Sequence, residues 1–255
     1  LDPKTFFSDK AERYARYRWD YSPQAVETLY KIAQLSQHSV VADIGAGTGI
    51  LTRHFAGRVS RVYAVEPNPD MRRVAVRDLA SQPSVRVIDG AAEATTLPRE
   101  AMDLITVAQA IHWFDPGPTM IEMARILKPA GWLAILRNIA IADEQDAALD
   151  QIVAKELGPG YAAIYPRSIK RPVDQYFGAG AYQKFTFSFH FWQDWPAFIG
   201  VMSTVSYMPP PTDPRFARIE REARTYFDHH SQDGALLVQG ETEMLIGQPV
   251  WRIES

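Results

Sequence analysis

Residues 40–49 read Val-Val-Ala-Asp-Ile-Gly-Ala-Gly-Thr-Gly, and this stretch decides the fold of the chain. An apolar run ends on an aspartate and an isoleucine, and glycines then alternate with small residues. A continuous apolar run is typical of a strand that is buried on both faces of a sheet. Glycines allow positive φ angles and let a ligand approach the backbone closely. The stretch therefore predicts a buried strand over 39–44, a ligand-binding turn, and a helix over 49–56.

The glycines at positions 45, 47 and 49 are spaced differently from those of dinucleotide-binding folds. Those folds carry Gly-x-Gly-x-x-Gly and seat a pyrophosphate at a helix N-terminus, whereas here the third glycine comes one residue earlier. Asp43 adds a carboxylate that would repel a phosphate and attract an ammonium group. A zwitterionic amino-acid tail that carries a sulfonium therefore suits the site better than a pyrophosphate.

Further features indicate an adenosine ligand. Glu66 ends the next expected strand, where an acid can accept hydrogen bonds from both ribose hydroxyls. Enzymes that use NAD share this acid, so it does not choose among adenosine ligands. The segment Gly90-Ala91-Ala92-Glu93 follows the third expected strand, where an adenine edge would lie. Met71 is placed to pack on the adenine face or, alternatively, in the core of its helix.

The residues on either side predict alternating strands and helices. The remaining expected strands are 61–66, 85–88, 103–107 and 132–136, with helices at 70–80 and 119–127. Such alternation predicts an α/β fold, with helices on both faces of a mostly parallel sheet. Farther along, helices are expected at 143–156, 194–205 and 215–229, a half-exposed antiparallel strand at 184–191, and a last strand within 243–253.

Five ordered motifs resemble those of class I S-adenosylmethionine-dependent methyltransferases. They occupy residues 43–49, 65–68, 90–98, 108–115 and 127–133. More narrowly, they resemble the type 11 small-molecule branch, which includes trans-aconitate-methyltransferase-like enzymes. The resemblance covers roughly residues 5–137. It implies a Rossmann-like seven-stranded sheet, S-adenosyl-L-methionine as the cofactor, S-adenosyl-L-homocysteine as the product, and in-line methyl transfer to an O, N or C atom of a small molecule.

The resemblance also implies a set of cofactor-binding residues. Asp43, Gly45 and Gly47 would line the methionine moiety, Glu66 the ribose, Ala92 and Glu93 the adenine, and Gln109 the region of the sulfonium. The expected set is completed by Ala46, Gly49, Pro67 and Met71. Many relatives carry an aspartate at the position of Ala91, so the contact with the adenine amino group falls here to the backbone or to Glu93.

Catalytic and substrate-binding residues are expected around the same crevice. His112 follows the fourth expected strand and is a candidate general base or substrate hydrogen-bond donor; the alternative is a structural histidine. In relatives, the segment that precedes the sheet closes over the cofactor. Tyr17 is therefore a second catalytic candidate, and Tyr14, Arg18 and Trp113 are expected at the substrate. The alternative is an amphipathic helix that packs its tyrosines on the core.

The chain is expected to form a single methyltransferase domain over 1–255. Within it we expect an N-terminal helical cap at 1–35, a cofactor-binding core at 36–140, and a helical insertion near the C-terminus at 194–240. The insertion is rich in aromatic residues and methionine, which suits a cap over an apolar substrate pocket. The same composition also suits a packing extension or a dimer surface.

Composition excludes several classes of function. A net charge of −3 and a pI of about 6.1 give no basic surface for nucleic acid. The chain has no cysteine, which excludes disulfides, thiolate zinc ligands and a thiol nucleophile. No apolar run reaches the ~18–20 residues that span a bilayer, and no spacing of acids and histidines suggests a metal site. We therefore expect a cytoplasmic protein without membrane or nucleic-acid partners; its oligomeric state is left open.

Two other functions fit parts of the sequence. A non-catalytic relative could bind the cofactor through the same motifs without transferring a methyl group. An NAD(P)-dependent oxidoreductase would share the acid at Glu66, but the glycine spacing, Asp43 and the later turn at 128–131 argue against it. Binding of S-adenosylhomocysteine or NAD(H) separates the methyltransferase from the oxidoreductase.

Overall fold

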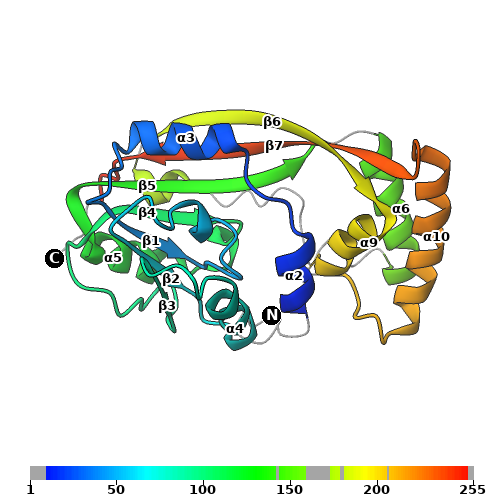
Figure 1. Cartoon of the computed structure of the whole chain (residues 1–255), viewed down its shortest axis with the longest axis horizontal. Helices are drawn as coiled ribbons and strands as arrows, with labels where there is room; N and C mark the ends of the chain where they lie inside the picture. Colours follow the sequence, from blue (N-terminus) through cyan, green and yellow to red (C-terminus); the bar gives the residue numbers. More distant parts are fainter. Residues whose placement is uncertain (1–9, 142–143, 159–172, 179–180, 206, 252–255) are drawn as a thin grey trace.

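The computed structural model describes residues 10–141, 144–158, 173–178, 181–205 and 207–251. Its centre is a seven-stranded sheet in the order β3-β2-β1-β4-β5-β7-β6 (Figure 1). The strands are β1 Val40–Ile44, β2 Arg61–Val65, β3 Val85–Ile88, β4 Met102–Ala108, β5 Leu127–Ala140, β6 Gln183–Asp194 and β7 Ala235–Gly247. Strand β7 runs antiparallel to both of its neighbours, and every other pair is parallel. The predicted α/β sheet is thereby confirmed.

Helices cover both faces of the sheet, as predicted. On one face α3 (Pro23–Ile32) buries Leu29 in a cluster with Val41 of β1 and Met244 of β7. On the other face α5 (Pro116–Ile126) buries Met123 against Ile105 of β4, together with the short α8 (Asp174–Phe177). Successive residues of a strand point to opposite faces, so the apolar β1 and β4 are buried on both sides, as their sequences predict.

The last three strands are long, and they join the sheet to a helical cap (Figure 1). The cap consists of α6 (Glu144–Leu157), α9 (Trp195–Thr204) and α10 (Pro214–His230). Val153, Phe198 and Phe227 are buried in its core, one from each helix. The expected insertion at 194–240 therefore contributes two of the three cap helices and the start of β7, while the third helix comes from before β6.

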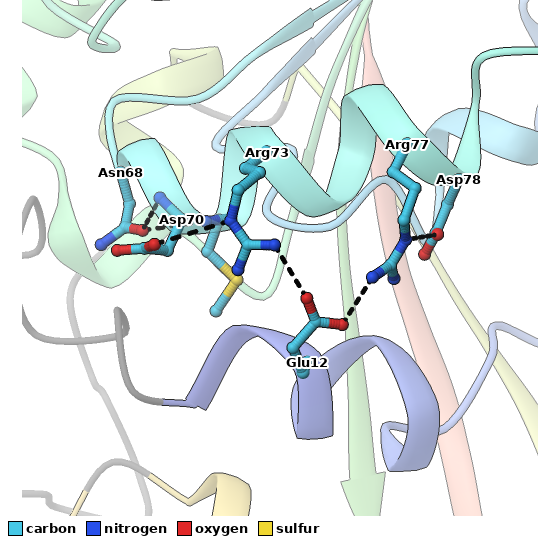
Figure 2. A network of polar contacts seen from close by, with 7 residues as sticks. Glu12, Asn68, Asp70, Arg73, Arg77 and Asp78 are labelled. Carbon is cyan, nitrogen blue, oxygen red and sulfur yellow. Dashed lines mark hydrogen bonds and ion pairs between the residues drawn. The ribbon is translucent and has the colours of Figure 1, made fainter.

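Helix α2 (Ala11–Tyr17) lies between the sheet domain and the cap (Figure 1). On the sheet side, Glu12 accepts hydrogen bonds from Arg73 at 3.0 Å and Arg77 at 2.8 Å on α4 (Pro69–Asp78) (Figure 2). The α4 helix is itself capped by Asn68, whose Oδ1 accepts from two backbone N–H groups. The ion pairs of Glu12 are exposed and contribute little stability. They therefore influence the orientation of α2 but contribute little to holding it against α4.

Buried contacts fasten α2 to the cap. Lys10 Nζ donates to the carbonyl oxygens of Val205 at 2.7 Å and Met208 at 2.9 Å, and this lysine is buried. The ring of Tyr17 packs directly on Gly200 of α9. A Cβ built on Gly200 would lie only 2.4 Å from Tyr17 Cγ, so the absence of a side chain there is what lets the two helices meet. Of the N-terminal cap expected over 1–35, the part from Lys10 onward is described.

The structure corrects the predicted element boundaries at 49–56, 132–136 and 243–253. Residues 49–56 form turns around a short 3-10 helix, Thr52–His54, because Gly49 adopts φ +87° and the Thr52 hydroxyl bonds Asp43. Strand β5 extends beyond 132–136 on both sides. The last strand begins at Ala235 and ends at Gly247, because β7 pairs with β6 along the whole of β6; residues 252–253 lie outside the described residues.

We expect Gly200→Ala to lower the midpoint of thermal unfolding, because the added methyl overlaps the Tyr17 ring. Overpacking of this kind costs about 1–3 kcal/mol. Gly117→Ala is the matched control, since a Cβ built there meets no atom within 4 Å, and it should leave the midpoint unchanged or raise it. Circular dichroism during heating measures both variants. A Gly200→Ala midpoint equal to that of the wild type would contradict tight packing between α2 and α9.

Candidate active site

A cavity of about 300 Å³ lies beyond the carboxyl ends of β1, β2 and β4. Gly45, Glu66 and Gln109 each follow one of these strands and line the cavity. This edge is where ligands bind in open α/β sheets. Ten of the predicted site residues are brought together on its wall: Tyr14, Gly45, Gly47, Glu66, Pro67, Met71, Ala92, Glu93, Gln109 and Trp113.

The glycine turn has backbone φ angles that residues other than glycine rarely adopt. Gly45, Gly47 and Gly49 all have positive φ, at 70°, 58° and 87°. Gly45 is also closely packed, because a Cβ built there would lie 2.6 Å from Ala110 Cβ. Gly47 differs, since a Cβ built on it meets no atom within 4 Å. Any side chain at 47 would occupy open space, and Gly47 itself lines the cavity.

Glu66 links the turn to the end of β2. Its two carboxylate oxygens accept hydrogen bonds from the backbone N–H groups of Gly47 and Asn68, each at 2.8 Å. The residue is buried, and desolvation raises the pKa of the carboxyl above its ordinary value against the effect of these hydrogen bonds. The carboxylate is therefore fixed in direction on the cavity wall before any ligand binds.

Asp43 lies behind the turn rather than on the cavity wall. Its carboxylate accepts hydrogen bonds from the hydroxyls of Thr52 at 2.6 Å and Thr106 at 2.9 Å. The residue is only 1% exposed, and desolvation raises its pKa to about 6 although both hydroxyls favour the charged form. In the structure, Asp43 connects the glycine turn to β4. It does not line the cavity, where the sequence predicted it beside a methionine moiety.

Gln109 directly follows β4 and lies in the left-handed region, with φ +57°. Its backbone N–H donates to Leu136 O at 3.0 Å, and its side-chain Nε2 donates to Asn138 O at 2.9 Å, both on β5. A non-glycine residue with such a φ is held there by its surroundings and is often found at functional sites. The predicted residue near the sulfonium is thus locked in one orientation on the wall.

The end of the cavity predicted for adenine has both apolar and polar walls. Met71 lines the cavity and is also buried against Ala11 and Val74, so its two predicted roles are compatible. Glu93 Oε1 accepts from the backbone N–H of Asp115 at 3.0 Å, so this carboxylate caps the start of α5. This cap could not be predicted from local sequence pattern, because Glu93 and Asp115 are far apart along the chain.

The other predicted site residues do not line the cavity: Asp43, Ala46, Gly49, His112, Tyr17 and Arg18. His112 lies in the 3-10 helix Ile111–Trp113, with its ring centroid 5.2 Å from that of Trp113. The Arg18 guanidinium carbon stands 5.1 Å from the centre of the Tyr14 ring. Tyr17 packs on Gly200 of the cap helix α9.

Phe114 is a wall residue that the sequence analysis did not single out. It lines the cavity, and its ring edge lies 3.2 Å from where a Cβ on Gly45 would be. It belongs to the quoted motif at 108–115, so that motif supplied a signal for it. Among the described residues, no group of three or more histidines, aspartates and glutamates is arranged to hold a metal ion. The described helices include none with the length and apolar character needed to cross a membrane.

This fold and cavity define a Rossmann-like α/β domain with a cavity at the carboxyl edge of its sheet, where ligands bind in open α/β sheets. Residues 42–135 match a family model described as a methyltransferase domain. Over 137 residues, the chain is 36% identical to an uncharacterized methyltransferase of Mycobacterium tuberculosis, with 54% of each chain covered. An uncharacterized methyltransferase of Schizosaccharomyces pombe is 35% identical over 137 residues, 53% of each chain. These alignments span about half the length of the curated relatives.

Solved structures share the fold over most of the chain. A protein of Anaeromyxobacter dehalogenans, provisionally described as a type II methyltransferase, has a TM-score of 0.64 at 22% identity, covering 91% of this chain and 97% of that one. The phosphoethanolamine methyltransferase 2 of Haemonchus contortus, solved with S-adenosylhomocysteine, has a TM-score of 0.58 at 12% identity. That match covers 98% of this chain and 61% of the other. At these identities the likeness concerns the fold, and it confirms the predicted fold class.

Asp43 should make stability depend on pH. Its pKa is about 6 in the folded chain and 3.8 ordinarily, so the folded state binds more protons between these values. Raising the pH through this window therefore lowers the free energy of unfolding, by roughly 3 kcal/mol in total. Asp43→Asn does not titrate, so its stability relative to the wild type should rise by this order between about pH 4 and pH 7.5.

Urea unfolding at a series of pH values measures this difference. Asp228→Asn, a change at an exposed aspartate on α10, is the control and should keep the wild-type profile. Equal pH profiles for the wild type and Asp43→Asn would contradict a raised pKa at Asp43.

Proposed function

We propose that the protein transfers a methyl group from S-adenosyl-L-methionine to a small molecule. The observation that carries the proposal is the hydrogen bond from Gly47 N–H to Glu66 Oε2, 2.8 Å long, on the wall of the cavity. This bond connects Glu66, an acid that can bind ribose hydroxyls, to the glycine turn, which can bind an amino-acid tail. Both residues of the bond line the same cavity. The family match over 42–135 supports the same reading.

The residues present suit this cofactor. Open space over Gly47 leaves room for a ligand against the backbone of the turn. The buried carboxylate of Asp43, directly beneath, adds negative charge that favours the ammonium and sulfonium groups. Met71, Ala92 and Phe114 give the cavity apolar walls that suit a purine ring. When bound, the cofactor supplies a methyl carbon that is activated by a positively charged sulfur.

The chain's own residues then align the acceptor and exclude water. Gln109, locked by its bond to β5, and Trp113 stand on the wall that follows β4. Tyr14 of α2 lines the same cavity, so α2 limits access of water from the N-terminal side. Holding the reacting groups in line is the larger part of catalysis for such a displacement. We infer that the methyl acceptor binds between Gln109, Trp113 and Tyr14. Arg18, whose guanidinium lies over the Tyr14 ring, adds a positive charge nearby.

An acceptor that carries a hydroxyl, an amine or an acidic carbon must lose a proton. We propose His112 for this role: it does not itself line the cavity, but it precedes Trp113, which does, on the short helix that follows β4. Tyr17 is not retained as a catalytic residue, because its ring is engaged with Gly200. A carboxylate acceptor would need no base.

His112→Asn tests this assignment. With an acceptor that must lose a proton, kcat/KM should fall by about 10²–10⁴-fold, the usual contribution of a general base, while affinity for S-adenosylhomocysteine stays unchanged. His190→Asn, at an exposed histidine of β6, is the matched control and should retain activity. Loss of S-adenosylhomocysteine affinity together with activity would instead make His112 a structural residue.

Calorimetric titration with S-adenosylhomocysteine tests the cofactor site itself. We expect micromolar binding by the wild type and at least a tenfold loss in Glu66→Ala, which removes the expected ribose acceptor and the carboxylate that bonds Gly47. Gly47→Val should weaken binding as strongly, because its side chain enters the space over the turn at a strained φ. Glu222→Ala, on the cap helix α10, should bind like the wild type.

The same titration separates the other candidate functions. Preference for NAD(H) over S-adenosylhomocysteine would overturn the proposal. The glycine turn would then be interpreted as the cofactor site of an NAD(P)-dependent oxidoreductase. Tight S-adenosylhomocysteine binding, with no transfer from S-adenosylmethionine to any of a panel of small acids, phenols and amines, would favour a non-catalytic cofactor-binding protein.

A further inference from the structure

Strand β6 forms one edge of the sheet, and no other described strand pairs with its outer side. An edge strand presents a row of backbone N–H and C=O groups that can pair with another chain. With 12 residues, β6 is long for this position, since a typical strand has about 5–6. Its whole length pairs with β7 in unbroken register, so no bulge turns the edge away from a partner.

The sequence of β6 also lacks the features that usually protect an edge. Proline and charges along the strand are the common devices. β6 contains no proline, and its lysine and aspartate, Lys184 and Asp194, stand close to its two ends. Between them only His190 can carry a charge. Trp192 adds a large apolar side chain that is 52% exposed. The edge is therefore open to pairing with a strand of another chain.

One face of β6 carries a row of phenylalanines that are only half-buried, at 185, 187, 189 and 191. The rings stack in pairs along the strand, with centroids 6.3 Å apart for Phe185 and Phe187 and 6.0 Å for Phe189 and Phe191. The first pair packs beside α3, and the second contacts Trp19. Side chains of a strand placed directly beside β6 would cover these rings further.

A second copy of β6 can supply such a strand. Two identical edges can pair antiparallel about a twofold axis, in which each copy uses the same surface. Residues opposite each other in an antiparallel pair lie on the same face of the sheet, so the phenylalanine face of one copy continues that of the other. With the axis at Phe189 or at Ser188, all but one residue of β6 is paired.

Charge distinguishes these two registers. With the axis at Phe189, Lys184 of each copy stands opposite Asp194 of the other, and opposite charges across a strand pair are stabilising. With the axis at Ser188, Lys184 stands opposite Trp192 instead. Within one chain Lys184 is paired with Glu243, and Asp194 accepts from the backbone N–H of Ala197. Both side chains are nevertheless exposed and can meet a second copy.

We propose that two copies of this chain pair through the outer edges of their β6 strands, antiparallel, about a twofold axis at Phe189. The two sheets then form one continuous sheet. Phe187 of each copy faces Phe191 of the other, and Ser188 faces His190. The pairing does not depend on methyl transfer, because β6 contributes no residue to the wall of the active-site cavity.

Sedimentation equilibrium over the micromolar range tests the pairing. The wild type should form a reversible dimer of twice the 28.7 kDa of one chain. His190→Glu places two carboxylates beside the axis and should raise the dissociation constant about tenfold. Adding Ser188→Lys should restore the dimer, because each new lysine faces the new glutamate of the other copy. His229→Glu, at an exposed histidine of α10, is the matched control and should leave the dimer unchanged.

Disulfide formation tests the register, since the natural chain has no cysteine. Oxidation of an equal mixture of Ser188→Cys and His190→Cys chains should give linked dimers, because these positions face each other. Ser188→Cys alone should link far more slowly, as should a mixture of Thr225→Cys and His229→Cys, two exposed positions on α10.

Three results would overturn the proposal. The first is a monomeric mass throughout the micromolar range. The second is a dimer whose dissociation constant His190→Glu leaves unchanged. The third is rapid linkage of Ser188→Cys alone, which would place the axis at Ser188. Binding of S-adenosylhomocysteine should be the same in His190→Glu as in the wild type, so the variant's fold and the cofactor site are checked separately from the pairing.

Discussion

The carboxylate of Asp43, buried beneath the glycine turn, is the interaction on which the rest of the site depends. Removing a charge from water is costly, and the threonine hydroxyls at 2.6 and 2.9 Å offset this only in part, since the pKa remains raised to about 6. In return, one side chain connects the end of β1 to Thr52 after the turn and to Thr106 on β4. The turn that presents Gly45 and Gly47 is thereby held against two strands.

A second constraint follows from the length of the last three strands. Because β5, β6 and β7 continue past the end of β4, they carry the cap helices beyond the edge of the sheet where the larger cavity lies (Figure 1). Helix α2 is held between the two parts, by Glu12 toward α4 and by Lys10 and Tyr17 toward the cap. The surface ion pairs are weak, so the buried contacts of Lys10 and Tyr17 determine where α2 lies and where Tyr14 meets the cavity.

The parts of the fold that could be predicted from the sequence are those encoded by local pattern. The apolar runs at β1, β2 and β4, the alternation of β6, and the glycine turn with Glu66 all depend on residues close in the chain. The predictions that failed involve distant partners. The register of β7 against β6 moved the last strand toward the N-terminus, and the Thr52 bond to Asp43 accompanies turns where a helix was expected.

The same distinction holds for the site. Glycines and an acid at strand ends can be recognised in sequence, because backbone conformation and the edge of a parallel sheet place them together. The roles of Tyr17, which packs on Gly200, and of Glu93, which caps α5, depend on contacts between distant segments. Both residues were expected at ligands because of the resemblance to methyltransferases, which places these segments beside the cofactor. In the structure, Tyr17 contacts Gly200, and Glu93 accepts a hydrogen bond from Asp115.

One polar network connects the wall of the active-site cavity to a second cavity, of about 170 Å³, that Trp19 lines beside the cap. Gln109, on the wall of the larger cavity, donates to the carbonyl of Asn138 on β5. The Asn138 amide donates to Asp20 O at 3.0 Å and accepts from the Thr242 hydroxyl at 2.7 Å. Trp19, which closes the second cavity, directly precedes Asp20. Polar networks favour one arrangement of their members over others. The orientation of Gln109 therefore depends on the backbone carbonyl of Asn138, and the position of the Trp19–Asp20 segment depends on the Asn138 side chain.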